Sequence, residues 1–180
     1  MKQFITSDTH FFHNNIIRYC NRPYRSVVEM NEDLIAKWNN VVGPDDEIYH
    51  LGDFCFGNFA KAQSVFDRLN GKKILLRGNH DPKHVLDLGW LNVHNYLYLT
   101  HGPVQLYLSH YPGAKHRADI ALHGHEHGNG HQTRHQVDVG VDCWNMSPML
   151  IDDLLEVAKT FPTTVDAERK PRSEKLINRD

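Results

Sequence analysis

Residues 47–53 read EIYHLGD, a short strand-like run that passes directly into a glycine and an aspartate. The stretches 2–10 (KQFITSDTH) and 73–81 (KILLRGNHD) repeat this arrangement, in which an apolar run ends in polar residues. Helical patterns separate the three stretches. The order strand, helix, strand, helix, strand predicts parallel βαβ units, so this half of the chain indicates an α/β protein.

Both intervening helices have a start signal and a stop signal. Ser26 and Glu29 form a capping box, and Gly43-Pro44 ends the helix that follows. Asn58 is the candidate cap of the second helix, and Gly71 lies beyond its end. Helical spacing predicts that the buried faces are Val27, Met30, Leu34 and Trp38 in one helix and Phe59, Ala62, Val65, Phe66 and Leu69 in the other.

The second half of the chain has the alternating pattern of a β-hairpin. Apolar residues alternate with polar or tyrosine residues over 93–99 and again over 104–108, with a turn between the two runs. This pattern predicts one buried face, and the second strand leads into His110. Further strands are predicted at 120–122 and 136–141, and a final helix at 152–159.

The length and composition indicate a single soluble domain without a nucleic-acid-binding surface. The 180 residues suit one domain, predicted over residues 1–160, followed by a charged C-terminal tail at 161–180. Lys and Arg total 20 and Asp and Glu total 22, a net charge of −2, which argues against a nucleic-acid or anionic membrane partner. Neither a membrane-spanning run nor a secretory signal is apparent, and three widely separated cysteines favour neither disulfides nor a thiolate zinc site. We therefore expect a cytoplasmic location.

The sequence contains 14 histidines, and several of them follow predicted strands. The polar side chains that are able to bind metal and that follow predicted strands are those of Asp8, His10, Asp53, Asn79, His80, His110, His125 and His127. In open α/β sheets, ligands bind in the crevice beyond the carboxyl ends of the strands. Side chains two residues apart in an extended segment point to the same side. We therefore expect Asp8 with His10, and His125 with His127, to chelate from one face each.

Five motifs occur in a fixed order along the chain. They are D-x-H at 8–10, G-D at 52–53, G-N-H-D at 78–81, an isolated histidine at 110 and G-H-x-H at 124–127. Together they resemble the motifs of the calcineurin-like metallophosphoesterases. Residues 7–17 and 139–145 further resemble a subgroup of small bacterial and phage-encoded members. Glu126 occupies a position that is often threonine or another small residue in this family, and we expect it to put an extra carboxylate near the metals.

This resemblance implies a fold and an activity. The fold is α/β, a four-layer α/β/β/α sandwich of two mixed β-sheets flanked by helices, with the metals at one edge. The activity is hydrolysis of phosphate esters at a dinuclear metal centre, by attack of a metal-bridging hydroxide. Phosphodiesters or cyclic nucleotides are favoured as substrates. The alternatives are a phosphomonoesterase, a nuclease and a non-catalytic binding scaffold of the same fold.

The resemblance also implies a role for each motif residue. One metal is expected to be held by Asp8, His10, Asp53 and His127. The second is expected to be held by Asp53, Asn79, His110 and His125, so that Asp53 bridges the two. His80 is expected to protonate the leaving oxygen or to stabilise the transition state. Asp81 is expected either to orient His80 or to cap the turn that follows.

The charge of such a centre suits a small phosphate-ester substrate. Two divalent cations, two aspartates and a hydroxide leave about one positive charge to attract the phosphate. Nitrogen and oxygen ligands without a thiolate suit Mn²⁺, Fe or Zn²⁺, and Mn²⁺ is expected because the family is commonly manganese-dependent. The candidate substrate-binding residues are His13, Asn14, Arg22 and Arg77, the arginines because a guanidinium group matches phosphate oxygens.

Overall fold

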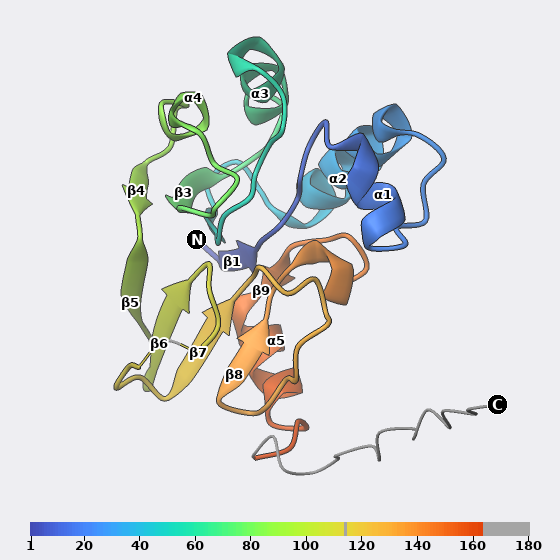
Figure 1. Cartoon of the computed structure of the whole chain (residues 1–180). Coiled ribbons are helices and arrows are strands. Elements are labelled where there is room, and N and C mark those ends of the chain that lie inside the picture. The colour runs from blue at the N-terminus through green and yellow to red at the C-terminus, as the bar shows by residue number, and fades with distance from the viewer. Residues whose placement is uncertain (114, 164–180) are drawn as a thin grey trace, which may run out of the picture.

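Strands and helices alternate in the first half of the chain, and the second half is mainly β-structure (Figure 1). A computed structural model describes residues 1–113 and 115–163. The helices are α1 (Asn14–Tyr19), α2 (Val27–Val41), α3 (Phe59–Phe66), α4 (Lys83–Leu86), the 3₁₀-helix η1 (Val141–Cys143) and α5 (Ile151–Ala158). The strands are β1 (Gln3–Thr6), β2 (Glu47–His50), β3 (Lys72–Leu76), β4 (Asn92–His94), β5 (Tyr96–His101), β6 (Val104–Ser109), β7 (Ile120–His123), β8 (Gln136–Asp138) and β9 (Met149–Leu150).

The strands form two mixed sheets. The first has the order β4-β3-β2-β1-β9, in which β1 to β4 are parallel and β9 is antiparallel to β1. The second has the order β5-β6-β7-β8, in which only β5 and β6 are antiparallel. Thr6 lies opposite His50, and His50 lies opposite Leu75. The carboxyl ends of β1, β2 and β3 therefore meet at one edge of the first sheet, where the polar motifs begin.

The first sheet is buried on both faces. Because successive side chains of a strand point to opposite faces, β1, β2 and β3 each contribute to two hydrophobic cores. On one face, Ile48 packs in a cluster with Trp38 of α2, and both are at most 1% exposed. On the other face, Tyr49 belongs to a cluster that includes Leu122 of the second sheet and Leu154 of α5. The strand ends that carry the polar motifs are thus fixed from both sides.

The expected α/β architecture of two mixed β-sheets flanked by helices is confirmed. None of the helices in the described ranges combines the length and the apolar character needed to cross a membrane. The domain limit at residue 160 stays a prediction. The charged tail predicted at 161–180 lies outside the described residues from 164 onward, whereas Phe161 packs against the core between the sheets.

Two predicted strands differ from the structure. The strand predicted at 93–99 is divided, because β4 pairs with β3 in the first sheet and β5 pairs with β6 in the second. The chain therefore crosses between the sheets at Asn95, and the alternating pattern continues through the crossing. The strand predicted at 136–141 ends at Asp138, since η1 follows shortly afterwards.

Other local features were only partly predicted. Ser26 caps α2 by accepting a hydrogen bond from the Glu29 N–H at 3.2 Å. The Glu29 carboxylate accepts from the Arg25 N–H at 2.8 Å instead of completing the capping box. Helix α1 and strand β9 were not predicted, since each is too short to show a clear periodic pattern.

His50, at the end of β2, is completely buried and takes part in hydrogen bonds between the segments that follow β1 and β2. Its Nδ1 accepts from the Gly52 N–H at 3.2 Å, so its Nε2 carries the proton and donates to Thr9 Oγ1 at 2.9 Å. The Thr9 hydroxyl donates to the carbonyl oxygen of Phe54, also at 2.9 Å. Burial disfavours the charged ring and lowers the pKa of His50 to about 3. His50 therefore stays neutral and links the two motif loops that follow β1 and β2.

We expect His50→Asn to make the stability of the protein less dependent on pH in the acid range. A histidine in the unfolded chain titrates near pH 6.5, whereas His50 stays neutral in the folded state. Below pH 6.5 the free energy of unfolding therefore falls as the pH falls, with a slope that approaches about 1.4 kcal/mol per pH unit. Asparagine cannot be protonated there, and it keeps an acceptor for the Gly52 N–H. Urea unfolding from about pH 7 to pH 5 measures the slope for both proteins. Equal slopes would show that His50 ionises within the folded state.

Candidate metal centre

The residues predicted to bind metal lie in loops whose backbone is unusual. Five of them have φ between 50° and 73°, namely Asp8, His10, Asp53, His125 and His127. Positive φ is uncommon outside glycine and persists only where the surrounding structure imposes it. The prediction that Asp8 with His10, and His125 with His127, lie on extended segments is therefore wrong. The left-handed backbone conformation of these residues directs their side chains toward the site.

Asp53 lies at the centre of the predicted ligands. Its Oδ2 is 3.5 Å from His10 Nε2 and 3.6 Å from His110 Nε2. Its Oδ1 accepts a hydrogen bond from the His80 N–H at 2.8 Å. One carboxylate oxygen is thus bound to the backbone, and the other faces two histidine nitrogens.

Asp81 holds the loop of Asp53 in place. Its carboxylate accepts hydrogen bonds from the backbone N–H groups of Asp53 at 2.8 Å, Phe54 at 2.9 Å and Gly78 at 2.8 Å. Burial raises the pKa of Asp81, and these three hydrogen bonds oppose that shift. Both predicted roles for Asp81 are wrong, because the carboxylate neither orients His80 nor caps α4. It ties together the loops that follow β2 and β3.

Gly52 allows these two loops to approach closely. A Cβ atom on Gly52 would lie 2.6 Å from Gly78 Cα and 2.7 Å from His110 Nδ1. Gly52 also has a φ of 98°, which side chains rarely tolerate. The G-D motif therefore needs its glycine for both space and backbone conformation.

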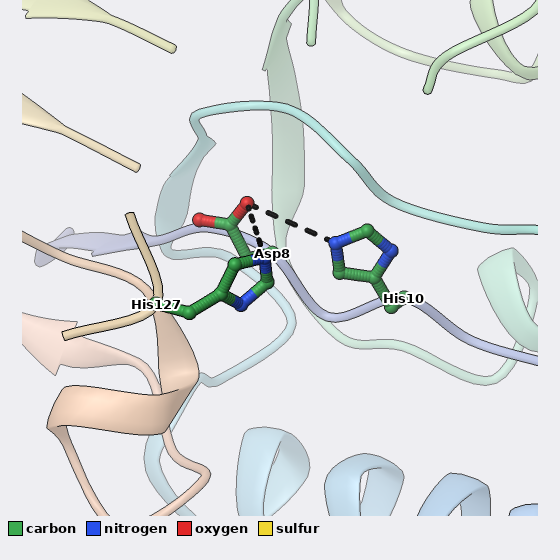
Figure 2. Close-up of side chains that lie close together, drawn as sticks. All are labelled: Asp8, His10 and His127. Atoms are coloured by element: carbon green, nitrogen blue, oxygen red, sulfur yellow. Dashed lines mark ion pairs between the residues drawn. The ribbon is translucent and has the colours of Figure 1, made fainter. Parts of the chain in front are cut away.

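Asp8, His10 and His127 form one group of ligand atoms (Figure 2). Asp8 Oδ1 lies 4.0 Å from His10 Nε2 and 3.9 Å from His127 Nε2, as the dashed lines in Figure 2 show. Asp8 Oδ1 and His10 Nε2 are buried and have no hydrogen-bond partner among the described residues. Ligand atoms about 2.1 Å from a common cation lie roughly 3–4 Å apart. The spacing and the unpaired atoms therefore fit a divalent cation.

His110, Asn79 and His125 form a second group on the other side of Asp53. His110 Nδ1 donates to the carbonyl oxygen of Leu51 at 2.8 Å, which leaves a lone pair on Nε2 in the neutral ring. That Nε2 lies 2.8 Å from Asn79 Oδ1 and 3.3 Å from His125 Nδ1. A nitrogen lone pair and an amide oxygen at 2.8 Å repel each other, and a bound cation, a proton on Nε2 or rotation of the amide removes this repulsion. This group also fits a metal ion.

Burial and neighbouring charges perturb the ionisation of the first group. Burial raises the pKa of the Asp8 carboxyl to about 7, although nearby His127 opposes the shift. Burial also lowers the pKa of His10 well below its usual value, and the charge of His127 adds to this effect. For His127, burial alone would lower the pKa, but the hydrogen bond to Asp142 contributes most to raising it to about 10. A bound cation would stabilise the Asp8 carboxylate and the neutral His10 ring together.

The buried ion pair of Arg22 and Asp142 fixes the orientation of the His127 ring. Asp142 Oδ2 accepts from His127 Nδ1 at 2.7 Å, which directs Nε2 toward Asp8. The Arg22 guanidinium donates to both Asp142 oxygens at 2.8 Å, and to the carbonyl oxygens of Asp8 and Thr9 at 2.7 and 3.0 Å. A methionine sulfur accepts its fifth N–H. The predicted contact of Arg22 with substrate is therefore wrong, since all its donors are used inside the protein.

Asp142 supports the candidate ligand His127, although no sequence motif identified it as a site residue. The only signal for it was its place in residues 139–145, the segment that resembles the subgroup. Asp142 and Arg22 are 120 residues apart in the sequence, so no local sequence pattern predicts that they pair. Burial would raise the pKa of Asp142, but the hydrogen bonds from His127 and Arg22 lower it, so the carboxylate stays ionised.

His80 and His13 lie at the rim of the centre. His80 is exposed, and its ring centroid is 5.9 Å from that of His10 and 5.0 Å from that of Phe56. His13 Nδ1 lies 3.4 Å from His10 Nδ1, and the His13 ring stacks on Phe56 with centroids 3.8 Å apart. Both predicted residues therefore lie beside the first group of ligands.

The structure places three other predicted residues outside the two groups of ligand atoms. Arg77 is exposed and lines a pocket beside His80. Asn14 lines a separate pocket of about 210 Å³ along α1. The Glu126 carboxylate lies over Gly130 and belongs to none of the potential ligand groups among the described residues, so the expected extra carboxylate near the metals is not seen.

Residues 1–145 match the family model of the calcineurin-like phosphoesterase superfamily domain. The chain belongs to this superfamily. All five motifs, from Asp8 to His127, lie within the matched region. Membership in the calcineurin-like phosphoesterases implies divalent metal ions, and the groups around Asp53 are candidates to bind them.

Alignments with similar proteins extend over most of this chain. An uncharacterized protein of Methanocaldococcus jannaschii is 36% identical over 178 residues, which cover 92% of this chain and 97% of that protein. The Gene 66 protein of Mycobacterium phage L5 is 29% identical over 181 residues, which cover 77% of this chain and 86% of that protein. A solved structure, a protein of unknown function from Aquifex aeolicus, aligns with a TM-score of 0.69 at 23% identity over 87% of this chain and 98% of that one. At this identity, the structural similarity establishes a shared fold.

We expect Asp142→Asn to weaken metal binding by about 10–100-fold, the usual effect of losing a carboxylate that orients a ligating histidine. Calorimetric titration with Mn²⁺ measures the affinity, and urea unfolding of the metal-free variant checks that it folds. Asp152→Asn is the matched control, because Asp152 pairs with a histidine at the surface. If both variants bind Mn²⁺ as tightly as the wild type, Asp142 does not orient His127 for metal binding.

Proposed function

We propose that the protein is a metal-dependent phosphoesterase that binds two divalent cations around Asp53. The observation that carries this proposal is the position of Asp53 Oδ2, 3.5 Å from His10 Nε2 and 3.6 Å from His110 Nε2. An oxygen shared by two groups of ligands can contact two cations. The proposed ligand sets are Asp8, His10, Asp53 and His127 for one cation and Asp53, Asn79, His110 and His125 for the other.

The composition of the ligand sets favours a phosphate ester as substrate. Two bound cations would neutralise the phosphate and lower the pKa of a bound water. Among the proposed ligands, only Asp8 and Asp53 are carboxylates, and the others are an asparagine and histidines, which bind metal as neutral rings. The centre therefore keeps positive charge for the substrate. Mn²⁺ is the proposed metal, and Fe or Zn²⁺ would suit the same nitrogen and oxygen ligands.

His80 is proposed as the group that protonates the leaving oxygen. It belongs to neither ligand set, it is exposed, and its backbone N–H is held by Asp53 Oδ1 at 2.8 Å. His13, beside His10, is proposed to contact the phosphate. Phosphodiesters or cyclic nucleotides are the proposed substrates, because a poor leaving group such as an alcohol of ribose benefits from an acid at this position.

A hydrolysis screen with Mn²⁺ tests the proposed activity. The substrates are bis-p-nitrophenyl phosphate, p-nitrophenyl phosphate and cyclic nucleotides, each assayed with and without a chelator. We expect metal-dependent turnover with a preference for diesters. Turnover that survives chelation, or no turnover of any ester with metal bound, would contradict the proposal.

Asp53→Asn should abolish turnover and weaken the binding of both metals, whereas His127→Ala should mainly weaken one. The reason is that Asp53 alone is shared by the two proposed ligand sets. Elemental analysis of the purified variants gives the metal content, and Asp67→Asn, at the exposed end of α3, is the matched control. Retention of two ions per chain at full occupancy in Asp53→Asn would disprove the bridging role.

His80→Asn should impair the hydrolysis of ribose esters far more than that of nitrophenyl esters. A nitrophenolate departs without a proton, whereas an alkoxide needs one, and general acid catalysis contributes about 10²–10⁴ in rate. The measurement is kcat/KM on both substrate classes, with metal content determined on the same preparation. Equal losses on both classes with the metals retained would mean that His80 acts on the phosphoryl charge and not as an acid.

A further inference from the structure

A pocket of about 320 Å³ adjoins the metal centre on the side of His80. Loops after β2 and β3 form it, and its lining includes Phe56, Arg77, Asn79, His80 and Pro82. Asn79 is a proposed metal ligand, and His80 is the proposed acid for the leaving oxygen. A group bound in this pocket would therefore be attached to the oxygen that His80 protonates.

Phe56 and Pro82 give the pocket an apolar wall. The Phe56 side chain is 43% exposed, although it stands next to a polar centre. Its ring is held in place by His13, which stacks on it with an interplanar angle of 12° and a centroid separation of 3.8 Å. Pro82 adds further apolar surface. A planar ring fits such a surface, because aromatic groups pack well by offset stacking or edge contacts.

The pocket also contains an uncompensated positive charge. Arg77 is exposed there, and it is absent from the ion pairs of the described chain, whose Lys and Arg members are Arg22, Lys37, Arg68, Lys83 and Lys159. Among the residues that line the pocket, Asp81 carries the one carboxylate, and its two oxygens accept hydrogen bonds from three backbone N–H groups instead of pairing with Arg77. A guanidinium group in this setting is suited to a phosphate or another anion.

We propose that this pocket binds the leaving group of the substrate, and that the preferred leaving group is a nucleotide. Its base would lie against Phe56, and its own phosphate would bind Arg77. This inference rests on the proposed phosphoesterase function. In the reaction, a water oxygen bonds to phosphorus and releases one proton to solvent, while the P–O bond to the leaving 5′-oxygen breaks. The proton from His80 then ends on that oxygen, and the leaving alcohol departs as a nucleoside monophosphate.

Two matched dinucleotides test the inference. They are thymidylyl-thymidine and the same compound with a phosphate on its terminal 3′-hydroxyl, which differ only in the charge of the leaving nucleoside. We expect the phosphorylated compound to have a kcat/KM at least about tenfold higher, because its added phosphate can accept a pair of charge-assisted hydrogen bonds from Arg77. Arg77→Gln should bring the ratio close to one. Arg18→Gln, an exposed arginine outside this pocket, should leave the ratio unchanged.

A binding measurement without metal provides an independent readout. Calorimetry in the presence of a chelator compares thymidine 3′-monophosphate with thymidine, and we expect the nucleotide to bind at least about tenfold more tightly unless Arg77 is replaced by glutamine. The pocket assignment alone would be overturned if the phosphorylated and unphosphorylated compounds had equal affinities and equal kcat/KM values. This conclusion requires that the enzyme still hydrolyses bis-p-nitrophenyl phosphate with Mn²⁺. Absence of hydrolysis of every ester would instead overturn the proposed function.

Discussion

The burial of two carboxylates, Asp8 and Asp53, is the constraint on which the rest of the site depends. Asp8 is fully buried and Asp53 is 2% exposed. A buried carboxylate must be paired, hydrogen-bonded or neutralised. Each of these two gives one oxygen to a backbone N–H, that of His125 at 3.0 Å and that of His80 at 2.8 Å. The remaining oxygens point toward histidine nitrogens, so a bound cation is the natural partner for both.

The fold makes this arrangement possible by covering the strand ends with packed side chains and by fixing the loops with buried polar groups. Asp81 binds the loops after β2 and β3, the Arg22 guanidinium binds the segment after β1, and His50 joins the loops after β1 and β2. These contacts impose left-handed conformations that the loops would not adopt alone. Such preorganisation holds ligand atoms at metal-binding distances before a metal arrives.

Patterns within the sequence predicted the order of elements up to residue 76 except for the short helix α1. The family resemblance predicted the two mixed sheets, and the motifs predicted the set of residues that meet at one edge. These features depend on local periodicity or on short motifs. The roles of Arg22 and Asp81 were not predictable in this way, because they depend on partners distant in sequence, such as Asp142, 120 residues from Arg22. The crossing at Asn95 was missed for a similar reason, since both sheets continue the same alternating pattern.

The most direct test of the account is a crystal structure with Mn²⁺ and an anomalous difference map recorded at the manganese edge. Two peaks per chain are expected, on either side of Asp53 Oδ2, one contacted by His10 and the other by His110. A single peak with no contact to Asp53, or metal bound only at the alternative group of Cys20, His127 and Asp142, would contradict this expectation.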